Sequence, residues 1–157
     1  MNTITCVLEL TQRLYRGLDR LAPAADLALR LYVANIFWKA GLVKIQSWSS
    51  TLYLFEYEYA VPLLPPTAAA YLGTGIELVF PVLLALGLTG RLAAAVLFAF
   101  NIMAVVSYPA LNAAGVADHQ LWGLLLAVLV VRGPGALSLD RLLWPPLRRR
   151  LGLPAPC

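Results

Sequence analysis

The feature that most constrains the fold is an apolar run over residues 68–88 that contains a single carboxylate, Glu77. As a helix, this run is about 20 residues long, which is enough to cross the hydrocarbon core of a bilayer. An ionisable side chain near the bilayer centre costs about 3 kcal/mol on insertion scales, so it normally faces protein or a water-filled cavity and has a partner. The sequence therefore predicts a membrane span whose neighbours provide a partner for Glu77.

Composition agrees with a membrane location for the whole chain. Of the 157 residues, 61% are hydrophobic and 13% charged, and the mean hydropathy is +0.75. Soluble domains carry about 25% charged residues. The net charge of +4 does not indicate nucleic-acid binding, because the basic residues lie beside apolar spans, where orientation in a membrane explains them.

Hydrophobic periodicity and helix-breaking residues predict an all-α fold. We expect a four-helix transmembrane bundle, preceded by an amphipathic interfacial helix that Pro23 ends and followed by a short interfacial segment. The predicted division is 1–23 for the interfacial helix, 24–135 for the four-span domain and 136–157 for the basic C-terminal tail. The four spans are expected at about 27–45, 68–88, 91–108 and 120–131.

The distribution of basic residues predicts the orientation. If both termini are cytoplasmic, ten of the twelve Lys and Arg residues fall on that side, and only Lys39 and Lys44 fall toward the other. An excess of basic residues marks cytoplasmic segments. We therefore expect a protein of the cytoplasmic (inner) membrane with both termini inside.

Four residues predict an intramembrane polar pocket: Asn35, Lys39, Glu77 and Asn101. At 1.5 Å per residue, Glu77 lies roughly 15 Å and Lys39 roughly 10 Å below the outer ends of their helices, so the two side chains are expected to pair. Such a pocket would bind a headgroup or relay protons. The alternative is a structural clamp that only satisfies buried charges.

A second group of polar and aromatic residues is expected at the outer face: Glu58, Tyr108, Asp118, His119 and Trp122. His119 is the only histidine, so it is the candidate for titration near neutral pH or for proton donation to a quinone. The alternative is a hydrogen-bonding residue at a helix end. No metal site is predicted, because no second ligand of suitable spacing accompanies it.

Several motifs together resemble the DoxX family of small four-helix membrane proteins. They run over about residues 27–143 and comprise Phe37 with Gly41 and Lys44, the run 58–66, the run 69–72, Glu77-Leu78, the run 81–84, the turn 87–91, Tyr108-Pro109, His119 with Trp122, the run 133–135 and the run 138–140. The resemblance implies association with membrane redox complexes, since the family is named for a subunit linked to thiosulfate:quinone oxidoreduction. It implies no set of catalytic residues.

Three functions remain open from the sequence. The first is a membrane accessory or anchoring subunit of a redox system, with a protein partner, in which the pocket receives a quinone headgroup or relays protons. The second is a non-catalytic assembly or docking protein with a purely structural Lys/Glu pair, and the third is a small transporter, for which no inverted repeat is evident. No motif for an intrinsic flavin, haem or iron–sulfur cluster is present, so a self-contained enzyme is not predicted. We expect a monomer or small homo-oligomer.

Overall fold

The computed structural model describes residues 3–150 and residue 152, and within them every regular element is a helix. The all-α prediction is therefore confirmed for this part of the chain. Residues 1–2, 151 and 153–157, which belong to the predicted terminal segments, lie outside the described residues. The helices are α1 (Thr3–Gln46), α2 (Trp48–Tyr57), α3 (Pro66–Leu86), α4 (Gly90–Ser107), α5 (Ala113–Arg132) and α6 (Leu139–Arg150).

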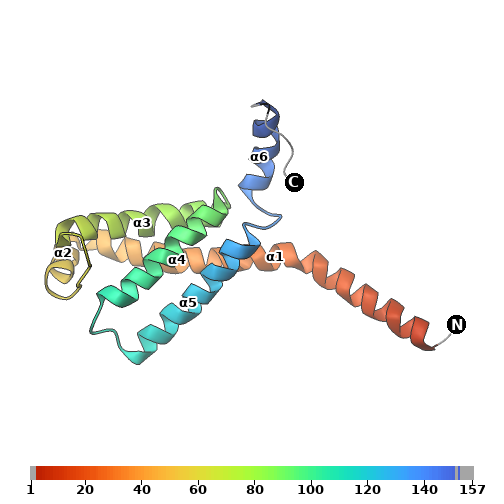
Figure 1. The fold of residues 1–157 in the computed structure, drawn as a ribbon, viewed down its shortest axis with the longest axis horizontal. Coiled ribbons are helices and arrows are strands. Elements are labelled where there is room, and N and C mark those ends of the chain that lie inside the picture. Colours follow the sequence, from red (N-terminus) through yellow and green to blue (C-terminus); the bar gives the residue numbers. More distant parts are fainter. Residues whose placement is uncertain (1–2, 151, 153–157) are drawn as a thin grey trace.

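The C-terminal half of α1 packs with α3, α4 and α5 (Figure 1). Consecutive helices α3, α4 and α5 are neighbours, and α1 contacts both α3 and α5, which closes the arrangement. By length and hydropathy, α3, α4 and α5 are able to cross a membrane. Helix α1 is not among them, because its C-terminal half carries Arg30, Lys39 and Lys44. Three predicted spans are thus supported, and the span by α1 stays a prediction.

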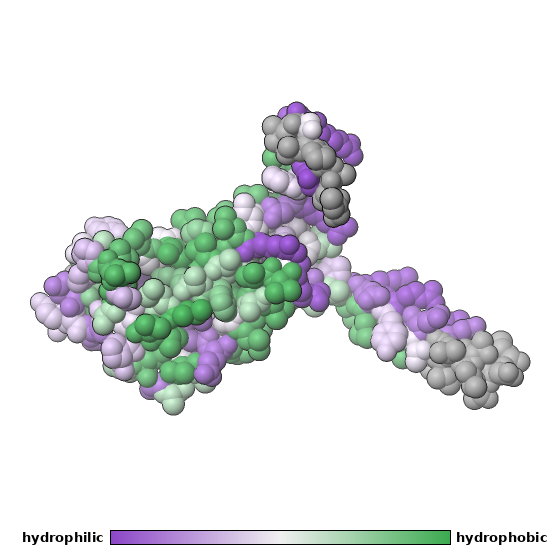
Figure 2. All heavy atoms as spheres, in the orientation of Figure 1, coloured by the Kyte–Doolittle hydropathy of each residue, from purple (hydrophilic) through white to green (hydrophobic). Residues whose placement is uncertain are grey.

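The core of the bundle is built from small and aliphatic side chains. Ala34 and Val33 of α1, Leu84 of α3, Ala93, Ala94 and Leu97 of α4, and Leu126 and Leu129 of α5 are buried together. Large apolar side chains also cover the outside, as the predominantly hydrophobic colour of the bundle in Figure 2 shows. An apolar exterior around a helical bundle is suited to lipid rather than water.

Helix α1 is continuous through Pro23, so the helix end predicted there is wrong. A proline inside a helix removes one hydrogen bond and crowds the preceding turn, which bends a helix more often than it ends it when good helix formers follow. The N-terminal part of α1 projects away from the bundle (Figure 1). Its exposed Leu14, Tyr15, Leu18 and Leu21 alternate with arginines. Its location at the membrane interface stays a prediction.

The loop between α3 and α4 contacts the segment between α5 and α6 at the end of the bundle where α1 enters and α6 leaves. Gly87, with φ of 65°, ends α3, and the carboxylate of Asp140 accepts hydrogen bonds from the backbone N–H groups of Thr89 (2.8 Å) and Gly90 (2.9 Å) at the start of α4. Arg30 is fully buried and donates to the carbonyl of Leu137. These contacts fix the segment that precedes α6.

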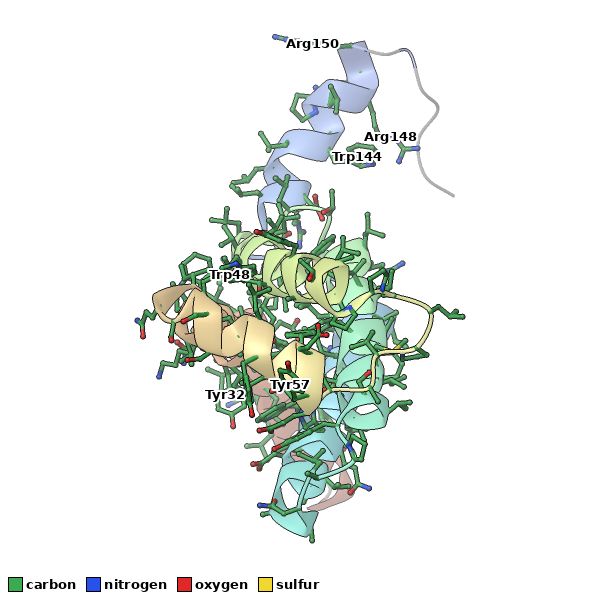
Figure 3. All side chains as sticks on the ribbon, turned by 90° about the vertical axis from the view of Figure 1, so that its left-hand side faces the viewer. Tyr32, Trp48, Tyr57, Trp144, Arg148 and Arg150 are labelled. Carbon is green, nitrogen blue, oxygen red and sulfur yellow. The ribbon has the colours of Figure 1, made fainter. Side chains whose placement is uncertain are left out.

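The opposite end is closed by α2, which the sequence predicted only as an aromatic-rich connector. Phe55 of α2 packs on Ala69 and Ala70 of α3, and Trp48 lies with its ring centroid 4.7 Å from that of Tyr71. Figure 3 shows Trp48 and Tyr57 at this end, and Trp144 and Arg148 of α6 standing clear of the bundle. Helix α6 extends through Pro145 and Pro146 and lies within the predicted C-terminal tail 136–157.

Candidate functional site

A cavity of about 620 Å³ lies at the α2 end of the bundle, between α1, α3, α4 and α5. Its walls are mainly aliphatic and aromatic, with contributions from Phe37, Phe55, Leu72, Ile76, Phe100 and Met103. The polar residues that line it are Lys44, Tyr59, Glu77, Ser107, Tyr108 and His119. This volume and this mixture of apolar walls with a few polar groups are typical of small-molecule sites.

Glu77 lies in the cavity wall and is paired with Lys44. The Lys44 ammonium donates to both carboxylate oxygens, at 2.8 Å to Oε1 and 2.6 Å to Oε2, and Glu77 is only 5% exposed. The hydroxyl of Thr51 donates to the carbonyl of Lys44 at 2.9 Å, which ties α2 to the end of α1. Both charges of the pair are therefore held in one geometry at the junction of three helices.

The partner of Glu77 is Lys44 and not the expected Lys39, because Lys44 shares the packed face of α1 with Gly41 whereas Lys39 is exposed. Gly41 lies against Glu77 and Leu78, since a Cβ at that glycine would come within 3.0 Å of the Glu77 Cβ. Gly41 lies five residues before the end of α1, whereas Glu77 lies eleven residues after the start of α3. Helix α3 therefore begins about 9 Å beyond the end of α1, and equal depths cannot be counted from the two ends.

Helix phase removes two further residues from the predicted pocket. The buried stripe of α1 is Arg30, Val33, Ala34, Phe37, Gly41 and, partly buried, Lys44. Asn35 and Lys39 lie off this stripe, are exposed, and do not line the cavity. The predicted place of Asn35 and Lys39 in the pocket is therefore wrong, because apolar side chains and the small Gly41, not the polar ones, decide which face packs on α3.

Asn101 is buried as expected, at 3% exposure, but it contacts His119 rather than the ion pair. Its amide Nδ2 donates to the backbone carbonyl of His119 at 2.9 Å, and its Oδ1 lies 2.8 Å from the ring Nδ1 of His119. The absence of a side chain at Gly123 leaves room for the amide, because a Cβ there would lie 3.2 Å from Nδ2. The predicted intramembrane and outer-face groups thus meet in one site.

Three of the five predicted outer-face residues line the cavity: Tyr108, His119 and Trp122. The rings of His119 and Trp122 meet edge to face with centroids 4.8 Å apart. Glu58 and Asp118 are exposed and do not line it.

The sequence analysis did not assign Lys44, Tyr59 and Ser107 to the site. Lys44 follows Phe37 by seven residues and Gly41 by three, so helical spacing could have placed it on the packed stripe. Tyr59 lies edge to face on Tyr108, with ring centroids 5.0 Å apart. Burial, the neighbouring Tyr108 and the carboxylates of Glu58 and Glu77 raise the pKa of the Tyr59 phenol, which therefore remains a neutral donor.

Ser107 carries the remaining polar atom of the wall. Its side chain is 5% exposed, and its Oγ is buried without a hydrogen-bond partner in the described part of the chain. The backbone carbonyl of the same residue accepts from Ala60 N at 2.7 Å, which fixes its position. Buried hydroxyls are normally satisfied, so the Ser107 hydroxyl is free to bond a water molecule or a ligand.

The arrangement is suited to an amphipathic molecule with a flat polar ring and an apolar tail. The polar Tyr59, Tyr108 and His119 form ring contacts in a wall that is otherwise mainly aliphatic and aromatic. Among the described residues, no group of three His, Cys, Asp or Glu side chains is placed to hold a metal ion.

Comparison with known proteins places the chain in context. The family model named DoxX matches residues 25–110. An uncharacterized protein of Haemophilus influenzae is 30% identical over 126 residues, which cover 74% of this chain and 82% of that relative. No solved structure matches the chain significantly.

Proposed function

Because the chain belongs to the DoxX family of membrane proteins, we propose that it is a multi-pass accessory subunit of a membrane redox system whose cavity binds a quinone headgroup. The observation that carries this proposal is the cavity of about 620 Å³ with apolar walls and a buried, unpartnered Ser107 hydroxyl. A quinone combines a flat ring, oxygen atoms for hydrogen bonding and an apolar tail, which are the properties that this wall complements.

The placement of α1 and the orientation in the membrane are parts of the same proposal. We place the C-terminal half of α1 across the inner membrane as the fourth span, because it packs beside α3, which carries the partner of its Lys44. The end that carries Arg91, Arg132 and α6 faces the cytoplasm, in accord with the excess of basic residues there. Reporter fusions at Gly115 and at the C-terminus should then report opposite sides of the membrane, and the same side for both would refute the topology.

Quinone binding can be followed through Trp122 in the purified protein in detergent. A short-chain benzoquinone should quench its fluorescence saturably, and replacement of Trp122 by Phe should remove the quenched component. Ala104→Phe, which places a ring in the cavity, should abolish binding, whereas Ala117→Phe on the exposed side of α5 should leave it unchanged. Equal quenching in Ala104→Phe and the parent protein would show that quinone binds elsewhere or non-specifically.

The redox role is tested by what accompanies the protein. Purification in a mild detergent, followed by identification of bound lipids and proteins, should recover a quinone and an oxidoreductase that carries its own redox cofactor. Ala104→Phe should lose the quinone and keep the oxidoreductase. Recovery of neither with the intact protein would refute the assignment.

A second function, non-catalytic assembly, is supported by the completeness of the Lys44–Glu77 pair. Both carboxylate oxygens already accept from Lys44, so this pair needs no ligand. In that case Lys44 and Glu77 clamp α1 to α3 and the cavity is a packing defect filled by lipid. A folded Lys44→Met, Glu77→Leu double variant that retains partner binding, in a protein that binds no quinone, would support this second function.

A further inference from the structure

The contact between α4 and α5 determines which nitrogen of His119 carries a proton. Asn101 makes two hydrogen bonds to His119, one to its backbone carbonyl (2.9 Å) and one to its ring Nδ1 (2.8 Å). A backbone carbonyl only accepts, so the amide nitrogen of Asn101 must face it. The amide oxygen then faces the ring.

An amide oxygen also only accepts, so the ring nitrogen opposite it must be a donor. Nδ1 of His119 therefore carries the hydrogen. In a neutral imidazole the other nitrogen, Nε2, then has a lone pair and no hydrogen. Asn101 thus fixes the tautomer of His119 and makes Nε2 a hydrogen-bond acceptor.

Nε2 is available to a ligand. His119 lines the cavity, its Nδ1 is directed to Asn101, and its ring is held at the edge of Trp122. Within the described residues no protein group bonds to Nε2. The unpartnered hydroxyl of Ser107 lines the same cavity and can serve a second oxygen of the ligand.

We propose that the cavity selects the reduced, hydroxyl-bearing form of its ligand, a hydroquinone, through a hydrogen bond from the ligand hydroxyl to Nε2 of His119. This rests on the proposed function, and it makes Asn101 a positioning residue. A carbonyl oxygen of the oxidised quinone has no hydrogen to offer, so two acceptors would face each other in an apolar wall. Sites that hydrogen-bond a ligand hydroxyl discriminate strongly against analogues without it.

The tautomer can be measured directly, because the chain contains a single histidine. Labelling with ¹⁵N-histidine gives one pair of ring nitrogen resonances in the unliganded protein. The structure predicts a protonated Nδ1 and an unprotonated Nε2 at a pH at which the ring is neutral. A protonated Nε2 in the parent protein would overturn the inference without any variant.

The ligand preference is measured by calorimetric titration of a short-chain benzoquinone and its hydroquinone under anaerobic conditions. We expect the hydroquinone to bind at least tenfold more tightly, since one satisfied buried hydrogen bond contributes about that factor. Asn101→Ala should mix the two tautomers in the ¹⁵N spectrum and remove most of this preference. The control is Asn35→Ala, which changes an exposed asparagine of α1 and should preserve both the tautomer and the preference.

The outcomes separate this inference from the proposed function. Equal binding of the two forms would overturn the hydroquinone preference and leave quinone binding intact. Binding of neither form would overturn both. If Asn101→Ala does not fold, Ser107→Ala provides the second test. It should lower the affinity for the hydroquinone and leave the His119 tautomer unchanged. An unchanged affinity would remove Ser107 from the ligand contacts and count against the site.

Discussion

The pairing of Lys44 with Glu77 leads to the sharpest prediction on stability. In Lys44→Met the carboxylate of Glu77, 5% exposed, loses both of its hydrogen bonds while it remains buried. Removal of one partner of a buried ion pair costs about 3–5 kcal/mol. Glu77→Gln should cost less, because the Lys44 side chain is 20% exposed and its ammonium can turn toward water.

The double variant decides whether the two residues act together. In Lys44→Met with Glu77→Gln no buried charge is left unpaired, so the loss of stability should be smaller than the sum of the single losses by about 2 kcal/mol. Lys39→Met is the matched control, because Lys39 is on the same helix and exposed. It should change the free energy of unfolding by less than about 0.5 kcal/mol and show no coupling to Glu77.

Thermal unfolding in one detergent measures these differences. The proteins compared are the parent, Lys44→Met, Glu77→Gln and their double variant, with Lys39→Met alone and combined with Glu77→Gln as controls. For a chain of this size, 3 kcal/mol corresponds to a change in Tm of about 6–12 °C. Additive effects of Lys44→Met and Glu77→Gln, or coupling of Lys39→Met to Glu77→Gln, would refute the pairing seen in the structure.

Three further predictions concern the packing around the site. Gly41→Val should destabilise the protein by about 1–3 kcal/mol in thermal unfolding, because the new Cβ would lie 2.8 Å from Leu78 Cδ2. The control Gly75→Ala, whose Cβ would meet nothing within 4 Å, should be neutral or stabilising. Equal effects of the two substitutions would contradict the close approach of α1 and α3. Asp140→Ala should cost about 1–2 kcal/mol by removing the cap of α4, and an unchanged Tm would contradict that contact. The pKa of Tyr59 is raised from 10.0, so the stability that its neutral phenol contributes is present below pH 10.0 and is lost as pH rises through the higher folded pKa. Tyr59→Phe should flatten this alkaline decline in the free energy of unfolding. An identical decline in both proteins would refute the burial of the Tyr59 phenol as its cause.

Much of the fold could be predicted because its causes are local in the sequence. The apolar runs of α3 and α4, their bounding Gly and Pro residues and the requirement that backbone groups bond within each span determine helices of about these lengths, whereas α5 begins at Ala113, seven residues before the predicted start at 120. That Glu77 and Asn101 are buried with polar partners could also be expected from the sequence, because buried polar groups in apolar helices need partners.

Tertiary structure alone decided which partners those groups meet. A period of 3.6 residues shows that α1 has faces, but the face that packs was selected by Phe37 and Gly41 against α3, which left Asn35 and Lys39 outside. Phe55 of α2 packs on Ala69 and Ala70 near the start of α3, and Lys44 at the end of α1 reaches Glu77. Hydrophobic pattern thus determined the elements, whereas the choice of facing helix surfaces, which no single helix encodes, decided the ion pair, the Asn101–His119 contact and the cavity.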